Sequence, residues 1–238
     1  MMRNSGGLLV VGATPQCGKS AVTAGIGLAL EQLGMRVDVV KPVDFHNHRH
    51  YQPGPLSDGE FLARCLPPSQ SVQSVWLPSA MEMTGLHWNR LLKVCTDMPN
   101  PVIIDTVGTV ATPIRFDAAD HISTVLDLAK AVGFPILLVV RKSPWVIEQM
   151  VPVLTLLAKT RTPVMGWVAV ETAPAGPLPF WENDCHYLMG AHRIPCLGEL
   201  PHHPSIQVGQ GYTGALHDMT ELGVDLLPIQ QALSLSVV

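Results

Sequence analysis

Residues 12–20 read Gly-Ala-Thr-Pro-Gln-Cys-Gly-Lys-Ser, a glycine-bounded loop that ends in a lysine and a hydroxyl residue. An apolar run, 8–11, precedes the loop, and a helical pattern, 19–33, follows it. This order of strand, loop and helix is the context of a phosphate-binding loop, in which backbone N–H groups, a lysine and a metal-binding hydroxyl meet the phosphates. The residues expected to bind a nucleotide are Gly12, Ala13, Thr14, Pro15, Gln16, Cys17, Gly18, Lys19 and Ser20. Five residues separate the two glycines, one more than is common, and a purely structural turn is the alternative interpretation.

Three more polar residues stand where a predicted strand ends or a helix begins. Lys41 follows the apolar run 37–40, and Asp105 follows the run 102–104. In open α/β sheets, ligands bind beyond the carboxyl ends of the strands. An acid at the end of such a run is typical of the carboxylate that holds Mg²⁺ in phosphate-loop proteins. With Asp58 at the start of a predicted helix, the expected Mg²⁺ ligands are Ser20, Asp58 and Asp105.

Several of these residues also have simpler interpretations. Lys41 could be a surface lysine, and Asp58 could be a first-turn acid that the helix dipole favours. Cys17 lies near a helix N-terminus, where a thiolate is favoured, but we interpret it as a small apolar filler. The histidines in two polar stretches are interpreted as solvated loop residues rather than as metal ligands: His46, His48, His50, His202 and His203.

The composition predicts a protein with a substantial buried core and no nucleic-acid partner. The 238 residues are 47% hydrophobic and 14% charged, which suits strands covered by helices on both faces. A net charge of −4 without a basic run argues against nucleic acid. The five cysteines lack Cys-x-x-Cys spacing and are interpreted as reduced thiols. No apolar stretch reaches the roughly 18–20 residues of a membrane span and no signal peptide is apparent, so a cytoplasmic protein without a membrane partner is expected.

Strand-like and helix-like segments alternate along the chain. Apolar runs lie at 8–11, 37–40, 102–104, 136–140, 164–170 and 194–200. Helical patterns lie at 19–33, 58–65, 84–95, 118–132, 144–159 and 181–189. This alternation predicts an α/β fold, with a doubly wound, mostly parallel sheet and helices on both faces, of the phosphate-loop NTPase type. No linker or shift in composition interrupts the pattern, so one domain is expected over residues 1–238.

Glycine, proline and capping residues predict where several helices begin and end. Gly34 and Gly133 stand where left-handed residues end helices. Residues 57–60, Ser-Asp-Gly-Glu, fit a capping box. Ser143-Pro144 fits a helix cap followed by the first helical residue, and Pro152 should bend or split that helix. The stretch 208–219 is expected to be irregular.

The phosphate loop and five further motifs, in this order, resemble the dethiobiotin synthetase family. The phosphate loop of that family reads Gly-Thr-Asp-Thr-x-Val-Gly-Lys-Thr, with the five-residue spacing of residues 12–20. The resemblance continues at Lys41-Pro42-Val43, at Ser57-Asp58, at 105–109 followed by Thr112-Pro113, at 169–174 and at 197–201. In order and spacing it covers nearly the whole chain.

The resemblance implies a reaction and a set of roles. The family uses ATP to join CO₂ to the diamino acid 7,8-diaminononanoate, and the products are the cyclic urea dethiobiotin of the biotin pathway, ADP and phosphate. The implied catalytic residues are Lys19 and Lys41, and Glu199 would lie near the nucleoside. Ser20, Asp58 and Asp105 would match the family's three Mg²⁺ ligands. Because the family works as homodimers, the implied partners are the diamino acid, CO₂ and a second copy of the chain.

The sequence also departs from the family, mainly at substrate and base positions. Pro15 replaces a threonine beside the substrate, and 105–109 reads Asp-Thr-Val-Gly-Thr where the family has Glu-Gly-Ala-Gly-Gly. Phe45 replaces a serine that touches the diamine, and Trp145 replaces a small residue near the helix start that receives the substrate carboxylate. Val170 replaces an asparagine that reads adenine, which predicts weak discrimination between bases. The alternatives are therefore a non-catalytic or regulatory nucleotide-binding relative and a partitioning ATPase, although no lysine precedes Lys19 in the loop as the latter requires.

Overall fold

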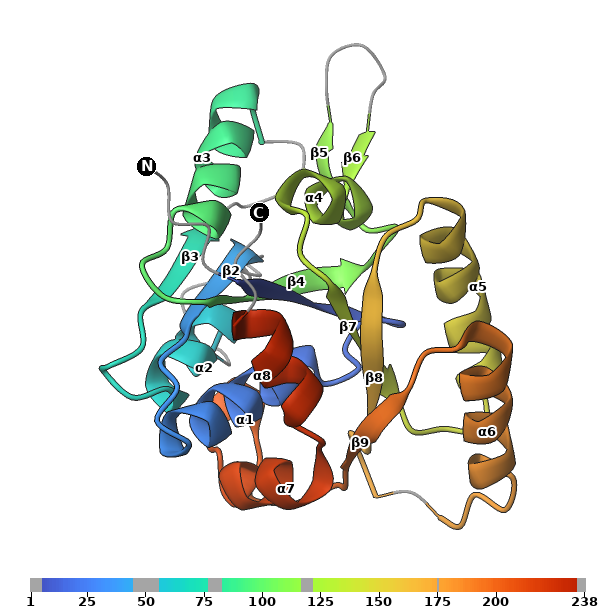
Figure 1. Ribbon diagram of the computed structural model, residues 1–238. Helices are drawn as coiled ribbons and strands as arrows, with labels where there is room; N and C mark the ends of the chain where they lie inside the picture. The colour runs from blue at the N-terminus through green and yellow to red at the C-terminus, as the bar shows by residue number, and fades with distance from the viewer. Residues whose placement is uncertain (1–5, 45–55, 77–82, 117–121, 175, 235–238) are drawn as a thin grey trace, which may run out of the picture.

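A computed structural model describes residues 6–44, 56–76, 83–116, 122–174 and 176–234. Its centre is a seven-stranded sheet in the order β3-β2-β4-β1-β7-β8-β9, in which every neighbouring pair is parallel (Figure 1). The strands are β1 (Gly7–Gly12), β2 (Asp38–Asp44), β3 (Val72–Trp76), β4 (Val102–Thr109), β7 (Ile136–Arg141), β8 (Val164–Val170) and β9 (Cys196–Leu200). Two short strands, β5 (Pro113–Phe116) and β6 (Ile122–Thr124), form a separate antiparallel pair. The predicted α/β fold is confirmed.

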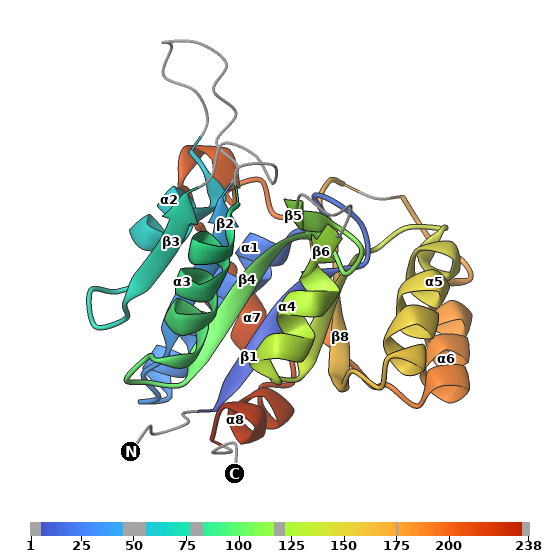
Figure 2. The same cartoon turned by 90° about the horizontal axis from the view of Figure 1, so that it is seen from above.

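Helices cover both faces of the sheet (Figure 2). One face packs against α1 (Lys19–Gln32), α2 (Asp58–Cys65), α7 (Leu216–Gly223) and α8 (Leu227–Ser234). The other packs against α3 (Gly85–Thr96), α4 (Val125–Val132), α5 (Val146–Lys159) and α6 (Trp181–His192). Along β1, Leu8 and Val10 face the first layer while Leu9 and Val11 face the second, which is why the run is apolar without alternation. No helix among the described residues is long and apolar enough to cross a membrane.

Most predicted elements and caps are confirmed. All six apolar runs contain a strand, and α2 has the predicted bounds and a complete capping box between Ser57 and Glu60. Gly133 ends α4 with a φ of 79°, and Gly34 follows the end of α1 with a φ of 78°. Since only glycine adopts this conformation without strain, these two residues fix where their helices stop.

Several local predictions were wrong in whole or in part. In the described part of the segment predicted as a helix over 118–132, the helix begins at Val125, because Ile122–Thr124 pairs with β5 instead. The helix after β7 begins at Val146 and not at Pro144. Pro152 does not split this helix, which continues to Lys159, and the alternative that Pro152 bends the helix stays a prediction. The stretch 208–219 is not irregular throughout, since it contains a 3₁₀ turn (Val208–Gln210) and the start of α7, whose Leu216 is buried.

Candidate functional site

The loop between β1 and α1 is a tight backbone cradle. The N–H of Ala13 donates to the carbonyl of Val139 at 2.8 Å, which fixes the loop to the neighbouring strand β7. Gly18 caps α1 with a φ of 96°, and a Cβ there would lie 2.8 Å from Cγ1 of Val170. The conformation and the space at this position both require glycine. The N-terminus of α1, with its free backbone N–H groups, therefore opens beside the loop as a phosphate site requires.

Cys17 is part of this packing. Its side chain is fully buried, and its Sγ donates to the carbonyl of Val139 at 3.2 Å. Burial raises the pKa of the thiol above its ordinary value, although the nearby Lys19 opposes the shift. The interpretation of Cys17 as a small apolar filler is confirmed.

Lys19 places a positive charge at the first turn of α1. Its side chain is only 7% exposed and lines a cavity beside the loop. Within the described part of the chain it donates no hydrogen bond to a protein acceptor. A buried ammonium that faces a cavity in this way is well suited to bind an anion.

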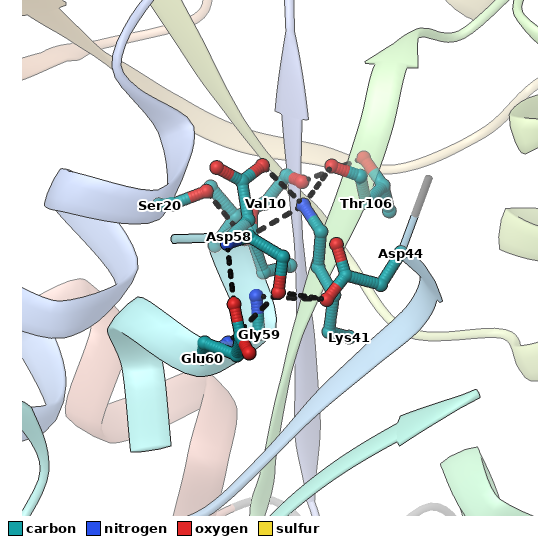
Figure 3. Close-up of polar contacts among 10 residues, drawn as sticks. Val10, Ser20, Lys41, Asp44, Asp58, Gly59, Glu60 and Thr106 are labelled. Atoms are coloured by element: carbon teal, nitrogen blue, oxygen red, sulfur yellow. Dashed lines mark hydrogen bonds and ion pairs between the residues drawn. The ribbon is translucent and has the colours of Figure 1, made fainter. Parts of the chain in front are cut away.

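Lys41 of β2 is the centre of a cluster of charged residues with Asp105 of β4 (Figure 3). The expectation that both residues follow their strands was wrong, because β2 continues past Lys41 to Asp44 and β4 past Asp105 to Thr109. Its Nζ lies 2.9 Å from Oδ2 of Asp58 and 3.0 Å from Oδ2 of Asp105. The hydroxyl of Ser20 donates to the same Asp105 oxygen at 2.7 Å. The side chains of Lys41 and Asp105 are 2% and 0% exposed, whereas that of Asp58 is 46% exposed. The structure thus brings together the predicted metal ligands and both predicted catalytic lysines.

The cluster shifts the pKa values of its members in different directions. Burial lowers the pKa of Lys41, but Asp105 and Asp58 outweigh it and raise the pKa to about 12. For Asp58, burial acts upward, yet the charge and hydrogen bond of Lys41 bring the net pKa below its usual value. Burial raises the pKa of Asp105, and Lys41 opposes that shift. Lys41 is therefore a firmly protonated cation that holds two acids in place.

Asp44, the last residue of β2, positions the start of α2. Its Oδ2 accepts hydrogen bonds from the hydroxyl of Ser57 at 2.7 Å and from the N–H of Gly59 at 3.1 Å. Both donors flank Asp58, so this buried carboxylate sets where Asp58 meets Lys41. Sequence reasoning missed Asp44, because only its place at the end of a strand distinguishes it from a loop acid.

The residues present fit a hard divalent cation. Oδ1 of Asp105 is buried and has no hydrogen-bond partner, although such atoms are rarely left unpaired. Carboxylate and hydroxyl oxygens are the donors that Mg²⁺ prefers. No group of three or more His, Cys, Asp or Glu side chains suited to a metal occurs among the described residues, so this site offers two acids and a hydroxyl.

A cavity of about 540 Å³ runs from this cluster past the phosphate loop. Lys19, Ser20 and Asp58 are among the residues that line it. Others lie at or after the ends of β8 and β9 and at the start of α7: Val170, Glu171, Thr172, Leu200, Pro201, His202, His203, Ile206, Val208 and Leu216. The cavity falls in the size range of small-molecule sites, and its lining combines the charged residues of a phosphate site with several apolar side chains.

A family model described as AAA domain matches residues 6–208, which include the whole phosphate loop and the acid cluster. The chain belongs to this AAA domain family. The match supports a nucleotide-binding protein of the phosphate-loop NTPase type. It does not extend to dethiobiotin synthesis.

Solved structures similar to this AAA domain have the same fold at low sequence identity. A ParA family ATPase from Chlorobium tepidum TLS is 12% identical, with a TM-score of 0.51 over 96% of this chain and 98% of that one. The MinC:MinD cell division protein complex of Aquifex aeolicus contains a chain that is 13% identical, with a TM-score of 0.50 over 95% of this chain and 90% of that one. At these identities the likeness establishes the fold and nothing further.

Of the remaining predicted residues of the AAA domain, some line the cavity and others do not. Glu199 does not line the cavity, because its carboxylate bonds Lys142 at 2.6 Å and the indole N–H of Trp181. Pro15 and Val170 do line it. Trp145 caps α5 and is 65% exposed. Phe45 and the histidines at 46, 48 and 50 lie outside the described residues.

Proposed function

We propose that this protein is an ATP- and Mg²⁺-dependent carbon–nitrogen ligase that closes a cyclic urea from CO₂ and 7,8-diaminononanoate, as dethiobiotin synthetases do. The observation that carries the proposal is the buried Lys41 of β2 between Asp58 and Asp105, next to Ser20 of the phosphate loop. The ordered motifs shared with the dethiobiotin synthetase family support the same conclusion.

The chemistry of this reaction calls for two cations at separate points. The carbamate formed from one substrate amine attacks the γ-phosphorus of ATP, and ADP leaves. The second amine then attacks the carbonyl carbon of the mixed anhydride, phosphate leaves and the ring closes. Two anions meet in the first step, so the site must neutralise charge on both reactants. Lys19 is suited to the triphosphate and Lys41 to the carbamate and the transferred phosphoryl group.

Ser20, Asp58 and Asp105 would hold the metal ion. Mg²⁺ would neutralise charge on the phosphates of bound ATP. Lys41 orients both acids through its ion pairs, and Asp44 holds the helix start from which Asp58 projects. This arrangement fixes the positions of the charged groups, which is the main requirement for phosphoryl transfer.

We also propose that the chain acts as a homodimeric, cytoplasmic single domain, as the family resemblance implies. A second candidate function is a nucleotide-binding relative without catalysis. The observations that favour it are Pro15, which lines the cavity without a side-chain donor, and the exposed Trp145 at the start of α5.

Turnover assays separate the two functions. Purified protein with ATP and Mg²⁺ should form ADP at least about 10-fold faster when bicarbonate and 7,8-diaminononanoate are both present. Lys41→Ala should leave ATP affinity within a few-fold but lower that turnover by about 100-fold or more, because Lys41 acts on charge that develops in the transition state. Lys159→Ala, which removes an exposed lysine at the far end of α5, is the matched control and should behave as wild type. If neither substrate stimulates ADP formation, the non-catalytic function is the correct one.

A further inference from the structure

Glu171 lines the cavity just beyond the end of β8. Its N–H donates to the carbonyl of Leu200 at 2.9 Å, which continues the pairing of β8 with β9, and its side chain is 22% exposed. Among the described residues that line this cavity, Glu171 and Asp58 are the two acids. Asp58 bonds Lys41 of β2, and the strands β4, β1 and β7 lie between β2 and β8 in the sheet.

Two donors fix the orientation of the Glu171 carboxylate. Nζ of Lys142 lies 3.3 Å from Oε1, and the N–H of His202 donates to Oε2 at 3.2 Å. Lys142 is itself held by Glu199 at 2.6 Å and lies 5.4 Å above the ring of Trp181. Because a carboxylate has about four acceptor positions, Glu171 keeps capacity for further hydrogen bonds. The carboxylate is thus held in a fixed orientation and can still accept hydrogen bonds.

The charges around Glu171 favour an additional donor. One cation, Lys142, faces two carboxylates, Glu171 and Glu199, so the cluster keeps a net negative charge. The neighbouring wall, formed by Val170, Leu200 and Ile206, is apolar and suits the faces of a flat ring. A ligand that lies on this wall and offers an N–H group at its edge would complement both features. An edge that carries a carbonyl oxygen would be repelled by the carboxylate.

We propose that Glu171 selects adenine nucleotides by accepting a hydrogen bond from the exocyclic amino group of the base. The inference rests on the proposed function only in that the cavity binds a nucleoside triphosphate. The proposal replaces the expectation that the protein discriminates weakly between bases, because that expectation considered Val170 alone. Val170 lacks polar groups, but it packs against Gly18 of the phosphate loop and brings Glu171 to the cavity.

Matched nucleotides test this role without a mutation. The dissociation constants of ATP, ITP and purine riboside triphosphate, each with Mg²⁺, are measured by competition against a fluorescent ATP analogue. ITP carries a carbonyl in place of the amino group, and purine riboside triphosphate carries neither. A hydrogen bond to a charged acceptor predicts that ATP binds about 10- to 100-fold more tightly than either analogue.

Glu171→Gln then assigns the discrimination to this residue. An amide can accept from the amino group or donate to the carbonyl, so the ratio of ATP to ITP affinity should fall to within about 3-fold. Glu221→Gln, which removes the same charge from an exposed position on α7, should keep the wild-type ratio. Equal binding of ATP and ITP by wild type, or an unchanged ratio in Glu171→Gln, would overturn the role of Glu171 while the nucleotide site stands. Failure of all three nucleotides to bind would overturn the proposed function as well.

Discussion

Replacing Lys41 with methionine should destabilise the fold strongly, because it leaves a buried carboxylate without its cation. Nζ of Lys41 lies 3.0 Å from Oδ2 of Asp105, and neither side chain is more than 2% exposed. At that separation, and with an effective dielectric constant of about 20, the attraction is about 5–6 kcal/mol. Removal of one partner of a buried pair typically costs about 3–5 kcal/mol, which is the loss we expect in the free energy of unfolding at pH 7. The pair with the half-exposed Asp58 adds at most about 1 kcal/mol.

The loss should also depend on pH in a defined direction. Burial already raises the pKa of Asp105, and in Lys41→Met the lysine no longer opposes that shift. The folded variant then binds a proton on Asp105 at pH values where the unfolded chain has released it, so its stability falls as pH rises above about 4. In wild type, the contribution of Lys41 to the free energy of unfolding is complete below the ordinary lysine pKa. It disappears only when Lys41 loses its proton, as pH rises through its pKa of about 12. The difference between variant and wild type should therefore be smaller at pH 5 than at pH 8.

Urea unfolding followed by circular dichroism at both pH values measures this difference. Lys159→Met, at an exposed position, should stay within about 1 kcal/mol of wild type. The double variant Lys41→Met/Asp105→Asn should recover most of the lost stability, since it removes both charges. A loss below about 1 kcal/mol for Lys41→Met at pH 7, or a loss that does not change with pH, would refute the reasoning that a buried ion pair holds the site together.

Three further variants probe the nucleotide and metal positions. Lys19→Ala should weaken binding of ATP with Mg²⁺ by about 100-fold or more, because the loop N–H groups alone do not balance the charge of the γ-phosphate. Calorimetric titration measures this affinity, and an unchanged value would contradict the assignment of residues 12–20 as a phosphate-binding loop. Asp58→Asn and Asp105→Asn should each raise the Mg²⁺ concentration needed for half-maximal activity, and an unchanged requirement in both would remove the metal site. Asp44→Ala should lower the free energy of unfolding by about 1–3 kcal/mol in urea titrations, because the buried N–H of Gly59 and the partly buried hydroxyl of Ser57 lose their acceptor. A change below about 0.5 kcal/mol would contradict that role.

The phosphate loop and the strand ends could be predicted because their signals are local. An apolar run, a glycine-bounded loop and Lys-Ser at a helix start occupy one continuous stretch, and Asp105 directly follows the apolar run 102–104. The adjacent parallel strands β2, β4 and β1 then bring Lys41, Asp105 and the loop before Ser20 together, although β2 and β4 extend beyond Lys41 and Asp105. Here the fold class was enough to predict the contact.

Elements with weak patterns were missed. The strand β3 reads Val-Gln-Ser-Val-Trp and lacks the continuous apolar run of the central strands. It lies at the edge of the sheet and pairs only with β2. The helix α7 has eight residues and no side-chain cap, and its place is set by packing of Leu216 and Thr220 against α1. Such segments gain their structure from tertiary contacts and not from local preference.

Contacts between residues far apart in sequence explain the remaining differences. Glu199 was expected near the nucleoside; its carboxylate bonds Lys142 and Trp181 and is not among the residues that line the cavity, so its role stays a prediction. Glu171, which does line the cavity, had no feature in the sequence that set it apart from other acids. Only the pairing of β8 with β7 and β9 shows which of the two carboxylates faces the cavity.

The most direct test of the proposed ligase activity follows the carbon atom of CO₂. Protein is incubated with ¹³C-labelled bicarbonate, ATP, Mg²⁺ and 7,8-diaminononanoate, and the products are analysed by mass spectrometry alongside ADP. The proposal predicts dethiobiotin with one label in its urea carbonyl for each ADP formed, and no labelled product from Lys41→Ala. Tight ATP binding without labelled product, or ADP formed without the diamine at the same rate, would contradict it.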